Sequence, residues 1–302
     1  MSDTEVRNQQ LSRTSKAARD LTAKSEKYAL VSIDVSNFPL NDAGYVFPDA
    51  AGARRLGEPR LAAVLSGNCT VLHDLTLVNT GVSNWTSIGN ALLHCPALQS
   101  IRISCDPVTV RLRSVAYDDT FDAVCLGIIS SGNILTDINF SNCVLEQRTD
   151  FLALQMPFYW ALTKLDLSGN GLRDHCDIIA ALSRCSRLQH VDLSCNQLGL
   201  NAARALAIAL PACTSLIHLD LSCNRFTSYD SDSLGLSVRL CTALRHLSLR
   251  KNIWIGARGL QYISQDGGLS RLTHLDVSCC GIRFNDCVRL ANRFDYTRDR
   301  GM

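Results

Sequence analysis

Five segments of this chain repeat one pattern of apolar residues, and this repetition limits the available folds more than any other feature. Each segment has apolar residues at its first, fourth, sixth and eleventh positions and asparagine or cysteine at its ninth. The segments begin 26 to 28 residues apart, at Leu162, Leu188, Leu216, Leu244 and Leu272. Because one unit is too short to bury its own apolar face, the units must stack and share a core.

The positions within a unit predict its local structure. The fourth and sixth residues face the same way on an extended strand, so they and the first residue point into the core. The side chain at the ninth position can satisfy backbone groups that would otherwise be buried unpaired. That position holds Asn170, Asn196, Asn224, Asn252 and Cys280. A helix must then return the chain so that the next strand can pair in parallel.

The pattern L-x-x-L-x-L-x-x-N/C-x-L resembles the leucine-rich repeat. The 28-residue step, with a helical stretch between units, resembles the ribonuclease-inhibitor-like class of that superfamily. The resemblance implies an α/β horseshoe solenoid of about 8–9 repeats, with a concave parallel β-sheet and convex helices. It also implies a non-enzymatic protein-binding scaffold, and the family's targets range from nucleases and small GTPases to ciliary or cytoskeletal assemblies.

The N-terminal half of the chain follows the pattern less closely. A first strand is expected at residues 30–35, and a segment at 107–116 interrupts the later spacing. This insert alternates apolar and polar residues, so it is either an extended binding loop or a long turn. We predict a polar N-terminal arm or cap (1–27) and a solenoid (28–302) made of irregular repeats (28–161), regular repeats (162–282) and a C-terminal cap and tail (283–302).

Composition indicates the compartment and excludes some partners. The chain has 302 residues, 46% of them apolar, with a formal net charge of +2. This near-neutral charge gives no sign of nucleic-acid binding, and no apolar run is long enough to cross a membrane. The polar start lacks the apolar region of a secretory signal. We therefore expect an intracellular protein of the cytoplasm, with the cytoskeleton or a cilium as alternatives.

Eleven of the fourteen cysteines fall into three columns of the repeat. One column lies three residues before the first leucine, and the other two occupy the eighth and ninth positions. Neighbours in a column have parallel Cβ vectors, which do not suit a disulfide. We predict reduced and mostly buried thiols at Cys69, Cys95, Cys185, Cys213, Cys241, Cys105, Cys195, Cys223, Cys279, Cys143 and Cys280.

Strand alternation predicts that the third, fifth and seventh residues of each unit face outwards on the concave side. The third position contains four histidines, the fifth contains mainly aspartates, and the seventh contains mainly serines. We expect these side chains to be replaceable with little effect on folding. The predicted protein-binding surface consists of Asp166, His190, Asp192, His218, Asp220, His246, Arg250, His274 and Asp276.

Two chemical interpretations of these columns are disfavoured. In a sequence such as His190, Asp192, Ser194 the acid lies in the middle, whereas a catalytic triad needs the histidine there. Side chains that repeat in parallel do not converge as zinc ligands must. We therefore predict no catalytic residue, cofactor or metal.

Two interpretations remain open. The columns form a recognition surface, or they are simply the consensus of this repeat class. The predicted partner is a protein of unknown identity, with neither nucleic acid nor membrane as a partner. The alternative function is regulation of an enzyme, as in GTPase-activating or inhibitor proteins of the RanGAP and ribonuclease-inhibitor types.

Overall fold

The computed structural model divides the chain into two compact units, Met1–Asp137 and Ile138–Met302. The predicted N-terminal arm (1–27), the insert (107–116) and nearly all of the predicted C-terminal cap lie outside the described residues. The structure describes residues 30–36, 58–80, 82, 85–104, 121–131, 134–145, 149–173, 177–265, 269–283 and 285–286.

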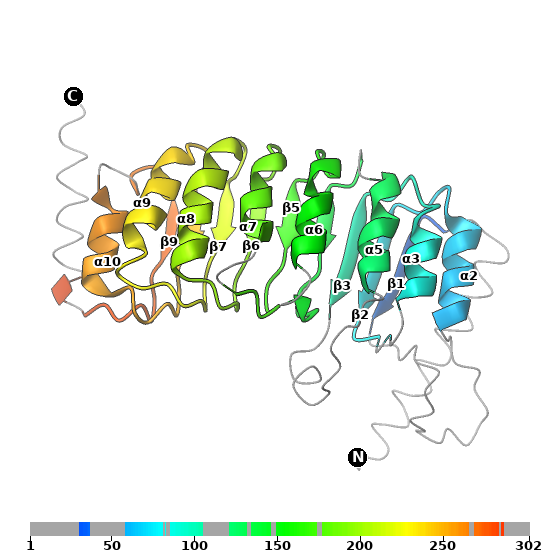
Figure 1. Cartoon of the computed structure of the whole chain (residues 1–302), viewed down its shortest axis with the longest axis horizontal. Helices are drawn as coiled ribbons and strands as arrows, with labels where there is room; N and C mark the ends of the chain where they lie inside the picture. Colours follow the sequence, from blue (N-terminus) through cyan, green and yellow to red (C-terminus); the bar gives the residue numbers. More distant parts are fainter. Residues whose placement is uncertain are drawn as a thin grey trace, which may run out of the picture. The chain divides into compact units, whose positions relative to one another are not determined.

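The first unit contains three parallel strands in chain order. These are β1 (Ser32–Ser36), β2 (Asp74–Val78) and β3 (Ser100–Ser104). Their register aligns Ile33 with Leu75 and Leu75 with Ile101, so the predicted first strand is confirmed. Figure 1 shows the helices of this unit as one layer beside these strands. The helical segments are α2 (Glu58–Asn68), α3 (Thr86–Leu92), α5 (Asp122–Gly127) and the 3₁₀ helix η2 (Ile128–Ser131).

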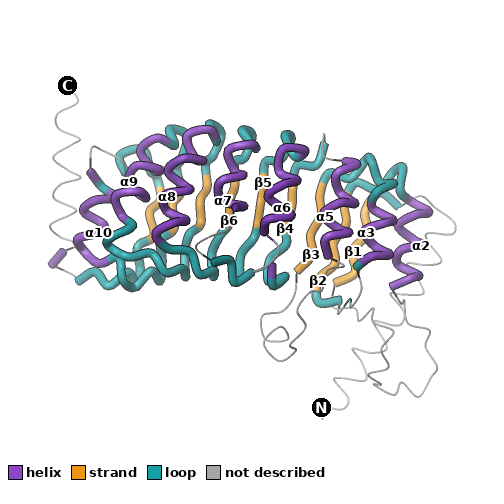
Figure 2. The backbone as a smooth tube through the Cα atoms, viewed as in Figure 1, coloured by secondary structure: helices purple, strands orange, loops and turns teal. Residues whose placement is uncertain are grey.

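The second unit repeats a three-residue strand followed by a helix, and its helices and strands again form two layers (Figure 2). The strands are β4 (Asp137–Asn139), which begins at the boundary between the units, β5 (Lys164–Asp166), β6 (His190–Asp192), β7 (His218–Asp220), β8 (His246–Ser248) and β9 (His274–Asp276). The α-helices are α6 (Thr149–Gln155), α7 (Asp177–Ala181), α8 (Leu200–Ala209), α9 (Ser231–Leu240) and α10 (Gly256–Ile263). The 3₁₀ helices are η4 (Met156–Phe158), η5 (Leu182–Arg184) and η6 (Leu210–Ala212).

The predicted leucine register is confirmed in the core. In the unit that contains β7, Leu216, Leu219, Leu221 and Phe226 are all buried. The preceding helix, α8, buries alanines and one leucine, Leu206, and these small residues let the helix lie close to its neighbours. Each fully buried leucine contributes roughly 1.5–3 kcal/mol through removal of apolar surface from water. The repeats therefore share one continuous apolar layer within this unit.

The ninth-position asparagines link each repeat to the one before it. The Oδ1 atom of Asn196 accepts hydrogen bonds from the backbone N–H groups of Asn170 and Leu172, both at 3.0 Å. Its Nδ2 donates to the carbonyl oxygens of Leu167 at 3.1 Å and Leu193 at 3.0 Å. Asn170, Asn224 and Asn252 make equivalent bonds, so the predicted role of the asparagine position is confirmed.

Ten of the eleven cysteines in the predicted columns lie in the described residues, and six of these ten are buried. All eleven described cysteines are free. In the column before the first leucine and the column at the ninth position, all the described cysteines are buried except Cys69, which is half-buried. In the eighth-position column, however, Cys195 and Cys279 are exposed and Cys223 is half-buried. Their φ angles are 55°, 56° and 54°, which is the left-handed region. This conformation turns the chain after the strand and directs the eighth side chain away from the core.

Candidate functional site

The candidate site is the face of the second unit's sheet that turns away from the helices, called the sheet face here. In β6 and β7 the middle residue is buried and the two flanking residues are half-buried, as expected for alternating side chains. The pairing register aligns His190 with His218 and Asp192 with Asp220. The structure therefore brings the predicted third- and fifth-position residues together in two parallel columns.

The third-position histidines form one continuous stack. The ring centroids are 4.5 Å apart for His190 and His218, 3.9 Å for His218 and His246, and 4.5 Å for His246 and His274. Adjacent ring planes are within 13° to 19° of parallel. Desolvation, followed by repulsion from neighbouring imidazoles, lowers the pKa of His218 and of His246. The rings of His218 and His246 are therefore favoured in the neutral form near pH 7.

The fifth-position aspartates are fixed by the turn that follows each strand. The Oδ1 of Asp192 accepts the backbone N–H of Ser194 at 2.8 Å, and Asp220 makes the same bond to Ser222. These bonds argue against the expectation that the aspartates can be replaced with little effect on folding, which stays a prediction. Each carboxylate holds a backbone N–H at the strand end, and an aliphatic or lysine side chain would leave that N–H without its partner.

The surroundings shift the pKa values of Asp192 and Asp276 in opposite directions. Burial raises the pKa of Asp192, and the neighbouring carboxylates Asp166 and Asp220 raise it further, against the hydrogen bonds from Ser194. Hydrogen bonds from Ser278 lower the pKa of Asp276, and Arg250 lowers it as well. Burial and the neighbouring carboxylates therefore disfavour the negative charge of Asp192, and a cationic partner there would relieve this repulsion.

The seventh position does not face solvent as uniformly as predicted. Ser141 and Ser222 are buried, Ser168 and Ser194 are half-buried, and only Ser278 and Arg250 are exposed. The serines lie in the turn whose backbone the preceding aspartate or asparagine caps, and their burial differs from one turn to the next. Arg250 is the one seventh-position residue that the sequence placed in the site, and its exposure fits that placement.

This arrangement does not resemble a catalytic centre. Asp166 uses Oδ1 to bind both the N–H, at 2.9 Å, and the Oγ–H, at 2.7 Å, of Ser168. The acid therefore orients the serine of its own turn, and the imidazoles stack on one another in a separate column. Within the described ranges, no group of three or more histidine, cysteine, aspartate or glutamate side chains could hold a metal ion. The geometry suits recognition by charge and hydrogen bonding.

A second exposed feature was missed by the sequence pattern. Trp254 occupies the eleventh position of its unit, which is buried in the three preceding regular repeats, yet 68% of its surface is exposed. The next residue, Ile255, fills the core in its place. Beside Trp254, Ile253 is 55% exposed, and Tyr229 of the preceding unit is 85% exposed.

The sequence contains a signal for this displacement. The eleventh-position N–H of one unit is normally accepted by the ninth-position asparagine of the next, as for Phe226 and Asn252 at 3.2 Å. The unit after Trp254 has Cys280 at this position, and a thiol offers no amide oxygen. The Cys280 Sγ still donates to the Leu249 carbonyl at 2.9 Å, which replaces only the donor half of the asparagine's role.

The repeated strand, capped turn and return helix define this chain as a leucine-rich-repeat solenoid, so the predicted α/β fold class is confirmed. A family model described as Leucine Rich repeat matches residues 184–207 and 212–228. The finer assignment to the ribonuclease-inhibitor-like class stays a prediction. No protein of the curated set matches the sequence.

Several solved structures are similar to the chain at low identity. Internalin C2 of Listeria monocytogenes is 16% identical, with 71% of this chain and 82% of that chain covered and a TM-score of 0.37. The human trophoblast glycoprotein 5T4 is 15% identical, with 58% and 69% covered and a TM-score of 0.38. A leucine-rich-repeat protein of Leptospira interrogans is 14% identical, with 76% and 60% covered and a TM-score of 0.41. In the part of the chain that the structure describes, no helix has the length and apolar character of a membrane span.

Proposed function

We propose that this chain is a non-enzymatic scaffold that binds a protein partner through the sheet face of its second unit. The observation that carries the proposal is the row of carboxylates formed by Asp166, Asp192 and Asp220. Strand pairing aligns Asp166 with Asp192 and Asp192 with Asp220. Three like charges in one row, at the ~4.8 Å spacing of neighbouring strands, favour a partner that presents lysine or arginine side chains.

The sheet face is already organised for binding. The Ser194 and Ser222 backbone N–H groups hold the Asp192 and Asp220 carboxylates, so these side chains lose little freedom when a partner docks. Preorganisation of this kind lowers the entropic cost of association. The stacked imidazoles beside the aspartates, such as His218, add polar contacts that remain neutral near pH 7. The proposed site contains Asp166, His190, Asp192, His218, Asp220, His246, Arg250, His274 and Asp276.

The proposal includes an intracellular location, with the chain as a subunit of a larger assembly in the cytoplasm, the cytoskeleton or a cilium. All the described cysteines are free, and a reduced state of this kind supports a reducing compartment. Burial raises the pKa of Cys185 and of Cys213 to about 12 in each case, so these thiols resist oxidation at neutral pH.

The test replaces charge while keeping the turn intact. Asn139 already holds the Ser141 N–H with its amide Oδ1 at 3.1 Å, so asparagine can take over the structural half of the aspartate's role. We therefore choose Asp192→Asn with Asp220→Asn. The matched control is Asp177→Asn with Asp232→Asn, which removes two exposed carboxylates from α7 and α9.

The partner is first isolated by affinity purification of the full chain at low salt with mass spectrometry, and its binding is then measured with purified proteins. We expect both variants to melt like the wild type. The sheet-face variant should bind its partner about 2–5 kcal/mol more weakly, while the control should bind normally. Equal binding by the sheet-face variant and the wild type refutes this site.

A further inference from the structure

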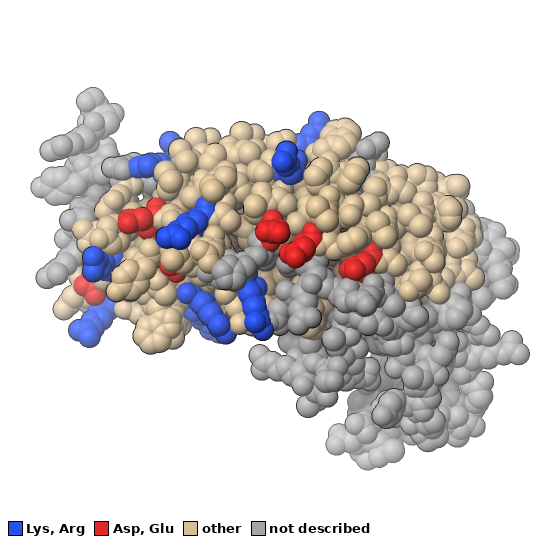
Figure 3. All heavy atoms as spheres, in the orientation of Figure 1, with Lys and Arg blue, Asp and Glu red and all other residues tan. Residues whose placement is uncertain are grey.

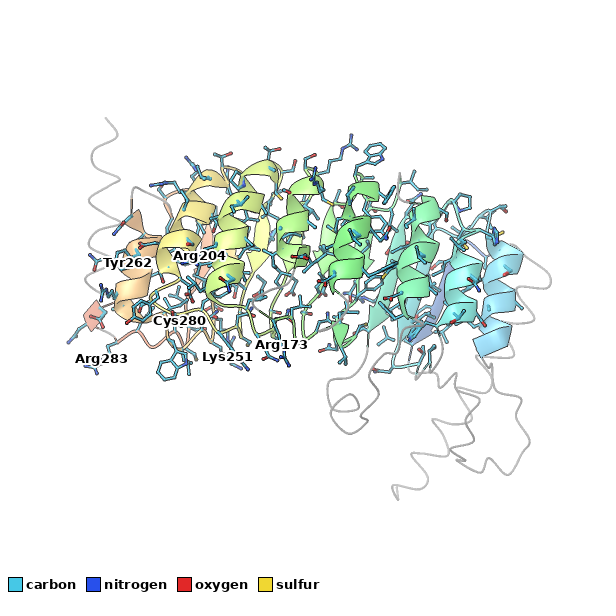
Figure 4. The ribbon with its side chains drawn as sticks, in the orientation of Figure 1. Arg173, Arg204, Lys251, Tyr262, Cys280 and Arg283 are labelled. Atoms are coloured by element: carbon cyan, nitrogen blue, oxygen red, sulfur yellow. The ribbon has the colours of Figure 1, made fainter. Side chains whose placement is uncertain are left out.

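The turns that follow β5 to β9 carry a surface of opposite charge to the sheet face. We define the post-strand edge as the eighth to twelfth residues of the five regular units. These turns contain four basic residues, and none of their residues is a carboxylate. The basic residues are Arg173, Arg225, Lys251 and Arg283, and all four are exposed. In Figure 3 basic side chains gather along the lower edge of this unit, where Figure 4 labels Arg173, Lys251 and Arg283.

The apolar side chains Ile253 and Trp254 lie in the middle of this basic edge. Arg225 occupies the same repeat position as Ile253 in the preceding unit, and Gly281 occupies it in the following unit. An added Cβ on Gly281 would come within 2.4 Å of the Ile253 carbonyl oxygen, so the neighbouring turn packs closely there without a side chain of its own. Ile253 therefore has the cationic Arg225 at the equivalent position on one side and a glycine, with no side chain, on the other.

Aromatic and basic side chains continue from this edge towards α9 and α10. The Ser228 N–H donates to the Trp254 carbonyl at 3.0 Å, which joins the backbone of the segment bearing Tyr229 to that of Trp254. Arg258 of α10 lies 5.7 Å from the Tyr262 ring centroid, and both Tyr229 and Asp232 interact electrostatically with it. Asp232, an exposed acid in the first turn of α9, interacts electrostatically with Arg258.

We propose that the post-strand edge is a second docking surface, which binds an acidic protein segment that places an apolar side chain against Trp254 and Ile253. Tryptophan and arginine are enriched at interface centres, where truncation costs the most affinity, and Trp254 and Arg225 supply both here. The cations at Arg225, Lys251 and Arg283 span three neighbouring turns, about 10 Å at the spacing of adjacent strands. An extended peptide covers that length in about three residues, so one apolar residue between two carboxylates fits it.

A protein segment fits this edge better than a single-stranded nucleic acid. Base stacking along a strand needs successive aromatic platforms. In the turns on either side of Trp254, the eleventh-position residue is the buried Phe226 or the half-buried aliphatic Ile282. Ile253 adds an aliphatic contact that favours a peptide side chain over a base.

The first test selects peptides without assuming a sequence. A displayed library of random 12-residue peptides is panned in parallel on the full wild-type chain, on Trp254→Ser with Lys251→Glu, and on Ile208→Ser. The last is a matched control, because Ile208 is 78% exposed on α8, away from the edge. We expect the wild type and the control to enrich peptides that combine aspartate or glutamate with an apolar residue, and the double variant to lose them. No such enrichment on the wild type, or equal enrichment on the double variant, overturns the proposal.

The second test measures an enriched peptide by fluorescence anisotropy. Lys251→Glu should weaken its binding about 10-fold or more, and raising salt from 50 to 300 mM should weaken it further. A fluorescent uridine 20-mer that binds more tightly than the peptide, and is lost in Lys251→Glu, would assign the edge to nucleic acid instead. Asp192→Asn with Asp220→Asn should leave peptide binding within about twofold, so failure of the sheet-face proposal is distinguishable from failure of this one.

Discussion

Replacement of Asn224 by alanine tests how the repeats are held together. The Asn224 Oδ1 accepts the Leu198 N–H at 3.1 Å, and its Nδ2 lies within bonding distance of the carbonyl oxygens of Leu193 and Leu221, at 2.9 and 3.0 Å. Both carbonyls keep another donor, because Asn196 also binds Leu193 and Asn252 also binds Leu221. The group that loses its side-chain partner is the buried N–H of Leu198.

The magnitude follows from this difference. One unsatisfied buried N–H costs about 1–3 kcal/mol, and each lost bond to an already paired carbonyl costs about 0.5–1 kcal/mol. We therefore expect Asn224→Ala to lower the free energy of unfolding by about 2–5 kcal/mol. Asn224→Cys should lose less, because a thiol at this position can donate to the preceding repeat, as Cys280 does to Leu249.

Two measurements check this prediction. Urea denaturation gives the loss of stability, with Arg225→Ala as the control, because the exposed neighbour should change stability by no more than about 0.5 kcal/mol. Hydrogen exchange reports the local effect, since the Leu198 amide should exchange faster in both Asn224 variants even if the solenoid does not unfold as one unit. Unchanged stability in Asn224→Ala, with unchanged exchange at Leu198, would refute the linking role of the asparagine.

Three further predictions follow from burial and charge. Leu219→Ala should lower the free energy of unfolding by about 2–5 kcal/mol, because Leu219 is buried between the sheet and the helices. Urea denaturation measures this loss, and a loss below about 1 kcal/mol would contradict the core position of Leu219. Thiol labelling of native protein, mapped by mass spectrometry, should modify Cys195 and Cys279 first among the described cysteines. Any disulfide among the described cysteines in protein kept from air contradicts the reduced state. Stability should fall as pH drops below about 6.5, because the pKa values of His218 and His246 in the folded chain lie below the ordinary value and the unfolded chain therefore takes up protons first. The variant His218→Gln with His246→Gln should show a weaker dependence of stability on pH. An unchanged pH profile in that variant would count against the histidine stack as the source of the dependence.

Periodicity was sufficient to predict the core and the two columns of the sheet face. A residue at the fourth position, such as Leu219, is buried because strand alternation and stacking leave it no other environment. The alignment of His190 with His218 follows from the same repeat length. These features depend on spacing alone, and spacing is visible in the sequence.

The orientation of side chains in the turns could not be predicted in this way. Cys195 is exposed because its φ angle of 55° turns it out of the core, although cysteine is usually a buried residue. Ser222 is buried in the turn capped by Asp220, although serine is usually exposed. Both outcomes depend on backbone conformation, which hydropathy does not encode.

Trp254 shows how one substitution in the next repeat can create a surface. Its own unit matches the pattern, so a position-by-position interpretation places it in the core. The change lies 26 residues later, at Cys280, where the amide oxygen that would accept the Trp254 N–H is missing. In this unit Ile255 takes the core position, and Ile253 and Trp254 lie exposed among the cations of the post-strand edge. The overall charge of +2 conceals this edge, because the aspartates of the sheet face offset its basic residues. A partner that bound both surfaces would need basic residues for the aspartates and acidic residues for the edge, and Arg250, where the two surfaces meet, is the residue whose charge reversal should affect both.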